Sequence, residues 1–195
     1  MEREASISRK TRETDIGVEL RLDGEGEPLI ATGVPFFDHL LVSFARHGLF
    51  DLRIQATGDL EVDQHHTVED VGIALGQALR VAVGEASGLA RFGSVRVPMA
   101  DALVQVDLDL SGRPYLVYRA ALPRDWVGQF DAALVEDFLY ALCTHGGIDL
   151  HVELVYGHNV HHIVESIFKG LGRALDQATR IDPRIRGPLS TKGSL

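Results

Sequence analysis

A chain of 195 residues is long enough to build one substantial core, or two small halves that share one. Its content of 45% hydrophobic and 24% charged residues is typical of a soluble globular protein and excludes the disordered and fibrous classes. A net charge of -9, from 28 acidic against 19 basic residues, disfavours nucleic acids and anionic membranes as partners.

The first half of the chain has the patterns of several strands and two helices. Apolar and polar residues alternate over residues 16–22, which predicts a half-buried strand that ends at the turn Asp23-Gly24. Aromatic and leucine side chains then recur at helical spacing over residues 36–44. Alternation returns over residues 52–56, and residues 68–83 have the longer pattern of an amphipathic helix.

The second half contains the same kinds of pattern. Residues 103–110 alternate and stop at the breaker Ser111-Gly112-Arg113-Pro114, and residues 164–178 predict an amphipathic helix. The single cysteine, Cys143, follows the apolar run of residues 138–142, where we expect a buried, inert thiol instead of a nucleophile. Strands mixed with helices in both halves predict the α+β class.

The chain repeats itself. Residues 38–53 align with residues 136–151, and after a gap of two residues, 63–79 align with 159–175. Both copies contain His-Gly, His-His-x-x-Glu and Leu-Gly-x-Ala-Leu in the same order. We therefore predict two similar sheet-and-helix half-domains, residues 1–90 and 91–195, packed as one compact body with pseudo-twofold symmetry.

A His-His-x-x-Glu cluster opens the last helix of each half. Asp63 and Asn159 stand two residues before the histidine pairs, where a short polar side chain caps the first helical turn. The histidines then lie at the positive end of a helix, which disfavours imidazolium and leaves neutral rings that can bind metal. Surface polar residues that merely open two helices are the alternative, but their occurrence in both copies favours a metal site.

Helical geometry sorts these residues into two groups. Residues four apart share a helix face, so the first histidine and the glutamate of each cluster can hold one ion. The second histidine points about 100° away, and it reaches the other half's ion if the pseudo-twofold axis brings the helix starts together. The predicted sites are His65, Glu69 and His162, and His161, Glu165 and His66. Mixed imidazole and carboxylate ligands suit Mn, Fe or Zn.

With these motifs the chain resembles the imidazoleglycerol-phosphate dehydratase family over essentially its whole length. Besides the two clusters, the matching stretches are Arg12-Glu13-Thr14-Asp15-Ile16, Leu22-Asp23-Gly24-Glu25-Gly26, Phe36-Phe37-Asp38-His39-Leu40, Arg91-Phe92-Gly93, Ser111-Gly112-Arg113-Pro114, Phe168-Lys169 and Ser190-Thr191-Lys192-Gly193. The resemblance implies a carbon-oxygen lyase that removes water from imidazoleglycerol phosphate, giving imidazoleacetol phosphate in histidine biosynthesis. Its partner would be this small phosphorylated imidazole.

The resemblance also implies two Mn²⁺ ions per active site, although the ligand types alone leave Zn and Fe open. The implied ligands of one ion are His39, His66, His161 and Glu165, and those of the other are His65, Glu69, His162 and a residue of the second repeat. Asp137 stands at the repeat position of His39, where many family members have a second histidine. Its carboxylate is a candidate for the last ligand, with His145 as the alternative.

The remaining site residues also follow from the resemblance. Glu13 is the expected proton shuttle, since a carboxylate can act as a general base near neutral pH. Guanidinium, ammonium and hydroxyl groups suit a phosphate, and the implied phosphate-binding residues are Arg91, Arg113, Lys169, Ser190 and Lys192. The resemblance also implies a homo-oligomer in which trimers assemble into a 24-subunit shell with active sites at subunit interfaces. No stretch reaches the roughly 18–20 apolar residues that span a bilayer, and no secretory signal is evident, so we expect the cytoplasm.

Two other functions fit the clusters. A di-metal hydrolase of a phosphate ester or amide also uses paired His and Glu sites, and it would release phosphate or amine. A metal-assembled scaffold would use the clusters only to join subunits, and it would assemble with metal but turn nothing over.

Overall fold

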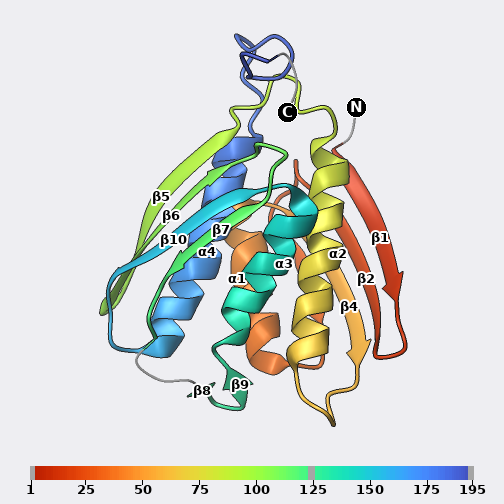
Figure 1. Cartoon of the computed structure of the whole chain (residues 1–195), viewed down its shortest axis with the longest axis vertical. Coiled ribbons are helices and arrows are strands. Elements are labelled where there is room, and N and C mark those ends of the chain that lie inside the picture. Colours follow the sequence, from red (N-terminus) through yellow and green to blue (C-terminus); the bar gives the residue numbers. More distant parts are fainter. Residues whose placement is uncertain (1–2, 123–125, 193–195) are drawn as a thin grey trace.

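In the described residues, two four-stranded sheets enclose a layer of four helices (Figure 1). This computed structural model describes residues 3–122 and 126–192, so Gly193 of the tail motif lies outside the described residues. None of the helices in these two ranges has the length and apolar character needed to cross a lipid bilayer.

The first half forms one sheet and two helices. Its strands pair in the order β1-β2-β4-β3, with β3 parallel to β4 and the other pairs antiparallel. The elements are β1 (Glu4–Lys10), β2 (Thr14–Arg21), β3 (Pro28–Ala31), α1 (Pro35–Gly48), β4 (Asp51–Gly58) and α2 (His65–Val83).

The second half has the same arrangement. Its strands pair in the order β5-β6-β10-β7, again with only the last pair parallel. The elements are β5 (Phe92–Met99), β6 (Ala102–Asp109), β7 (Tyr115–Arg119), β8 (Trp126–Val127), β9 (Phe130–Asp131), α3 (Leu134–Gly146), β10 (Asp149–Tyr156) and α4 (Val160–Thr179). The equal strand order confirms the α+β prediction of two similar sheet-and-helix halves, while the boundary at residue 90 stays a prediction.

The two halves interlock through their helices. Each long helix covers its own sheet but packs on the short helix of the other half: α2 on α3, and α4 on α1. The repeated Leu-Gly-x-Ala-Leu motif explains how they approach so closely. A Cβ atom on Gly76 would lie 2.7 Å from the carbonyl oxygen of Leu142, and one on Gly172 would lie still closer to that of Phe44. Only glycine permits these two helix contacts.

One hydrophobic core spans both halves. The Phe37 ring meets Phe138 edge-on with a centroid distance of 5.3 Å, and Phe138 stacks on Phe168 at 5.2 Å. All three side chains are completely buried or nearly so, and they come from three different helices. Cys143 is also buried, and burial raises the pKa of its thiol to about 12, in agreement with the expectation of an inert group.

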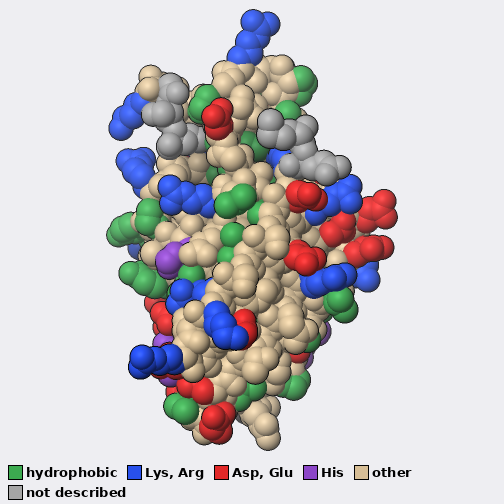
Figure 2. All heavy atoms as spheres, turned by 90° about the vertical axis from the view of Figure 1, so that its right-hand side faces the viewer, with side chains coloured by type: hydrophobic (Ala, Val, Ile, Leu, Met, Phe, Trp, Pro, Cys, Tyr) green, Lys and Arg blue, Asp and Glu red, His purple; other side chains and the backbone are tan. Residues whose placement is uncertain are grey.

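The outer face of the first sheet is polar and carries charges of both signs. Ion pairs of 3.8 Å and 3.7 Å join Arg53 to Glu19 and Arg21 to Asp51. Figure 2 views the molecule from the β1 side of Figure 1 and shows both basic and acidic side chains, mainly towards the margins of the face in view. Such exposed ion pairs contribute little to the stability of the fold, which therefore depends mainly on the helix layer and the core.

Candidate metal centre and phosphate pocket

Both histidine pairs lie at the start of a long helix. Asn159 occupies the N-cap of α4, and its side-chain oxygen accepts a hydrogen bond of 3.0 Å from the backbone amide of His161. Asp63 accepts a bond of 2.8 Å from the amide of His65 in the same way, although the N-cap of α2 is Gln64. The two predicted polar caps are therefore present, and each satisfies a backbone amide in the first turn of its helix.

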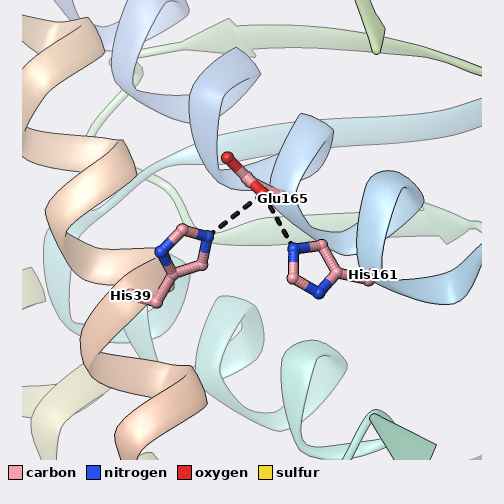
Figure 3. A group of neighbouring side chains, drawn as sticks. All are labelled: His39, His161 and Glu165. Atoms are coloured by element: carbon pink, nitrogen blue, oxygen red, sulfur yellow. Dashed lines mark hydrogen bonds and ion pairs between the residues drawn. The ribbon is translucent and has the colours of Figure 1, made fainter. Parts of the chain in front are cut away.

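Three predicted ligands converge between α1 and α4 (Figure 3). Nε2 of His39 lies 3.1 Å from Oε2 of Glu165, and Nε2 of His161 lies 3.2 Å from the same oxygen. One ligand atom from each residue lies within 4.8 Å of the other two. His39 lies in the first half, and His161 and Glu165 lie in the second. They meet because α1 packs on α4. This group, the first cluster, has the ligand types and the spacing of a metal site.

Glu165 carries a negative charge in this cluster. Burial opposes its ionisation, but hydrogen bonds from Lys169 and His39 outweigh burial and lower its pKa to about 2. Nζ of Lys169 lies 2.8 Å from Oε1, and the Ser43 hydroxyl donates to that oxygen at 3.5 Å. Oε1 is therefore held from one side while Oε2 faces the two histidines.

A second cluster is the repeat equivalent of the first. Nδ1 of His65 lies 3.5 Å from Oδ2 of Asp137, and Nε2 of His65 lies 4.0 Å from Oε2 of Glu69. Asp137 comes from α3, which packs on α2 just as α1 packs on α4. The geometry thus brings Asp137 to the place that His39 has in the first cluster. His145 lies near the opposite end of α3, where its Cβ adjoins Gly76.

His66 and His162 do not join the other half's cluster within the chain. Among the described residues a single group brings three potential ligand atoms together, and it contains neither histidine. Nδ1 of His66 lies 3.0 Å from Asp59, a hydrogen bond that raises the pKa of His66, and Nδ1 of His162 lies 2.6 Å from Asp101. The crossing was expected if the helix starts came together, but within this chain α1 and α3 lie between the starts of α2 and α4 (Figure 1).

Four of the five expected phosphate-binding residues line one depression of about 790 Å³: Arg91, Arg113, Ser190 and Lys192. The guanidinium of Arg91 donates to both carboxylate oxygens of Asp109 at 2.6 Å and 2.7 Å, and to the carbonyl oxygen of Leu189 at 2.6 Å. Arg184 and Arg186 also line this pocket, and the Arg-Ile-Arg run was the sequence signal that could have found them. Lys169 lies instead beside Glu165.

The phosphate pocket and the first cluster lie at opposite ends of α4. The backbone amide of Arg91 donates to the carbonyl of Ala178 at 2.8 Å, which places Arg91 at the last turn of the helix. His161 is in the first turn, and a rise of about 1.5 Å per residue puts about 25 Å between them. In Figure 1 the C-terminal tail is accordingly at the top and the start of α4 at the bottom.

Glu13 lies in the turn between β1 and β2. Its side chain is 55% exposed, and Oε2 is 3.8 Å from Nδ1 of His66. The Glu13 carbonyl accepts a bond of 3.1 Å from the amide of Asp59, which ties the turn to the end of β4. Glu13 is therefore at the histidine end of the molecule, with a half-exposed carboxylate.

Comparison with known proteins gives one consistent result. The model of the family described as Imidazoleglycerol-phosphate dehydratase matches residues 32–175. Proteins of that name from Acetivibrio thermocellus and Geobacter metallireducens are 57% and 54% identical to this chain, over the full length of both partners. These relatives favour a dehydratase over the hydrolase and scaffold alternatives.

Solved structures agree with this family match. The crystal structure of imidazoleglycerol-phosphate dehydratase from Staphylococcus aureus is 35% identical, with a TM-score of 0.84 over 92% of this chain and 99% of that one. The Pyrococcus furiosus enzyme, solved in complex with (S)-C348, is 41% identical with a TM-score of 0.84 over 97% and 100%. The chain therefore belongs to the imidazoleglycerol-phosphate dehydratase family and is a hydro-lyase of histidine biosynthesis that removes water from imidazoleglycerol phosphate.

Proposed function

We propose that the dehydration takes place in active sites that are completed between chains and that hold two Mn²⁺ ions each. The observation that carries this proposal is the separation of about 25 Å between the first cluster and the phosphate pocket of one chain. A small phosphorylated imidazole is far shorter than α4, so it cannot reach both in the same chain. The pocket of a neighbouring chain has to supply the phosphate contacts.

The described side chains fit the implied metal ions. The proposed ligands of the first ion are His39, His66, His161 and Glu165, and those of the second are His65, Glu69, His162 and Asp137. Three of the first set already converge, and Glu165 is ionised. Imidazole nitrogens and carboxylate oxygens suit Mn²⁺, and they also suit Zn²⁺ and Fe²⁺. His66 and His162 would then complete metal sites whose other ligands belong to neighbouring chains. The proposed assembly is a shell of 24 subunits built from trimers, and it is cytoplasmic.

Each of the chain's own groups has a separate task in the reaction. Manganese ions held by these histidines and carboxylates would supply positive charge next to the imidazole ring of the substrate. Glu13 accepts the proton from C2 of the glycerol chain, a weakly acidic position because no carbonyl is adjacent. The hydroxyl leaves from C3, so the proton and the hydroxyl together account for the water that is lost. Arg113, Ser190 and Lys192 hold the phosphate by charge-assisted hydrogen bonds and so fix the distance of C2 from Glu13.

Metal removal and return test this proposal. Protein stripped with a chelator should form imidazoleacetol phosphate at least about 100-fold more slowly than the same protein with Mn²⁺ restored. Full activity without metal would refute a metal-dependent site. Release of phosphate would favour the hydrolase, and assembly without product would favour the scaffold.

The phosphate pocket is tested by Arg113→Ala. Loss of a charge-assisted contact worth about 1.5–3 kcal/mol should lower kcat/KM by about 10- to 100-fold, chiefly through a higher KM. Steady-state kinetics at varied substrate concentration measure this, with Arg53→Ala on the outer face of the first sheet as the control. Equal kinetics for Arg113→Ala and wild type would remove Arg113 from the site.

A further inference from the structure

Each histidine outside the clusters is gripped by an aspartate. Nδ1 of His66 lies 3.0 Å and 3.2 Å from the two oxygens of Asp59, and Nδ1 of His162 lies 2.6 Å from Oδ1 of Asp101. An ionised carboxylate can only accept hydrogen bonds, so Nδ1 of each neutral ring carries the hydrogen and donates it. The lone pair is then on Nε2, the nitrogen that remains available to a metal ion.

Asp101 is itself fixed in place. Its other oxygen, Oδ2, accepts backbone N–H bonds of 2.7 Å from His158 and 2.9 Å from Asn159, in the segment that leads into α4. Asp101 therefore joins the segment that leads into α4 to the imidazole of His162.

The duplication relates Asp101 to Glu13. Leu20 of β2 pairs with Leu52, and Leu108 of β6 pairs with Leu150, the repeat equivalent of Leu52. Counting back along β2 and β6 from these matched leucines places Glu13 and Asp101 at the same position, one residue before each strand.

These two carboxylates differ in what they bind. Asp101 hydrogen-bonds His162 directly, whereas Glu13 lies 3.8 Å from His66 and Asp59 makes the hydrogen bond in its place. In the first half Asp59 therefore makes the hydrogen bond to the histidine that Asp101 makes in the second half. At equivalent positions of the two halves, Asp101 thus hydrogen-bonds a histidine, while Glu13 stays half-exposed at 3.8 Å from one.

We propose that Asp59 and Asp101 are positioning residues that hold His66 and His162 with Nδ1–H occupied and Nε2 presented to metal ions of the assembled site. This inference rests on the proposed function and assigns a task to two carboxylates that the reaction itself does not use. In this assignment each aspartate acts through one histidine.

Mn²⁺ titration of the assembled protein tests the assignment. In the proposed ligand sets His66 belongs to the ion that shares Glu165, and His162 belongs to the other. Asp59→Ala should therefore weaken one of the two Mn²⁺ affinities by about 10- to 100-fold, and Asp101→Ala should weaken the other. Asp59→Asn keeps an acceptor for Nδ1–H and should recover part of the loss.

A variant of the same helix start separates positioning from a structural role. Asn159→Ala removes the hydrogen bond to the amide of His161 but leaves Asp101 bonded to His162. It should lower the Tm of the metal-free protein and leave both Mn²⁺ affinities unchanged. If Asn159→Ala weakens Mn²⁺ binding as much as Asp101→Ala does, the contribution of Asp101 is structural and the inference is overturned.

The Glu165→Gln background gives the sharper comparison. This variant should keep only the ion that uses His162, so adding Asp59→Ala should change little, while adding Asp101→Ala should weaken the remaining ion. Equal effects of the two aspartates in this background would contradict the assignment. If wild-type protein binds fewer than two ions per chain, the proposed function fails; two ions with unchanged affinities in both aspartate variants refute only this inference.

Discussion

Glu165→Gln is expected to remove one of two bound metal ions and to reduce turnover strongly. Loss of a residue that hydrogen-bonds a metal ligand costs roughly 10- to 100-fold, and loss of a ligand itself should cost more. Glu165 is the carboxylate on which His39 and His161 converge, at 3.1 Å and 3.2 Å. Hydrogen bonds from Lys169 and His39 outweigh burial and lower its pKa to about 2, so it is an anion near neutral pH. Glutamine keeps the shape of the side chain but removes the charge.

Metal analysis and kinetics together measure this effect. Glu153→Gln, on an exposed position of β10, is the matched control and should match wild type in metal content and kcat. Thermal unfolding of the metal-free proteins is measured as well, because Glu165→Gln also deprives Lys169 of its ion pair. A Glu165→Gln protein that folds, binds two ions and turns over normally would remove the first cluster from the reaction.

Glu13→Gln should lower kcat by about 10²- to 10⁴-fold, the usual contribution of a positioned general base. The side chain is half-exposed and makes no short hydrogen bond to His66, so an amide there leaves the metal ligands undisturbed. Metal content and Tm are expected to stay at their wild-type values. Loss of kcat with intact metal would separate proton transfer from metal binding.

Glu61 provides the control for this experiment. It lines the same depression as Glu13, so Glu61→Gln removes an equal charge from the same surface. Stopped and continuous assays of product formation should give wild-type kcat for Glu61→Gln. Comparable activity in the Glu13 and Glu61 variants would show that Glu13 is not the proton acceptor.

Much of the fold follows from periodicity and from the repeat. Alternation over residues 16–22 and 103–110 corresponds to β2 and β6, and the duplicated motifs correspond to two sheets with one strand order. The short hairpin of β8 and β9 has no repeat equivalent and is too short to produce a periodic signal.

The pairing of ligands across the halves was harder to predict. A repeat shows that His39 and Asp137 are equivalent, but it does not show which glutamate each one meets. That choice depends on long-range packing, in which Gly172 lets α4 approach α1 and Gly76 lets α2 approach α3. The same packing keeps the second histidine of each pair from crossing within one chain, because a helix of the other half intervenes.

The phosphate-binding residues show a different limit. Arg91 and Arg113 meet the C-terminal tail because the segment after α2 pairs with residues of that tail, including Ser87 with Pro188. No spacing rule links residues so far apart in sequence. The contact of Lys169 with Glu165, in contrast, can be predicted from the sequence. The two residues are four apart on α4, and their side chains form an ion pair.

Mixed assemblies test most directly whether the active site is completed between chains. Coexpression of Glu165→Gln chains with chains that carry both Arg113→Ala and Lys192→Ala gives particles in which each chain has only one intact part. If the first cluster and the phosphate pocket of a site come from different chains, each part is intact in about half of the sites when the two chains mix equally and at random. Both parts are then intact in about a quarter of the sites. Product formation near a quarter of the wild-type rate is therefore expected; activity no higher than that of the two parent variants, in particles shown to be mixed, would contradict the shared site.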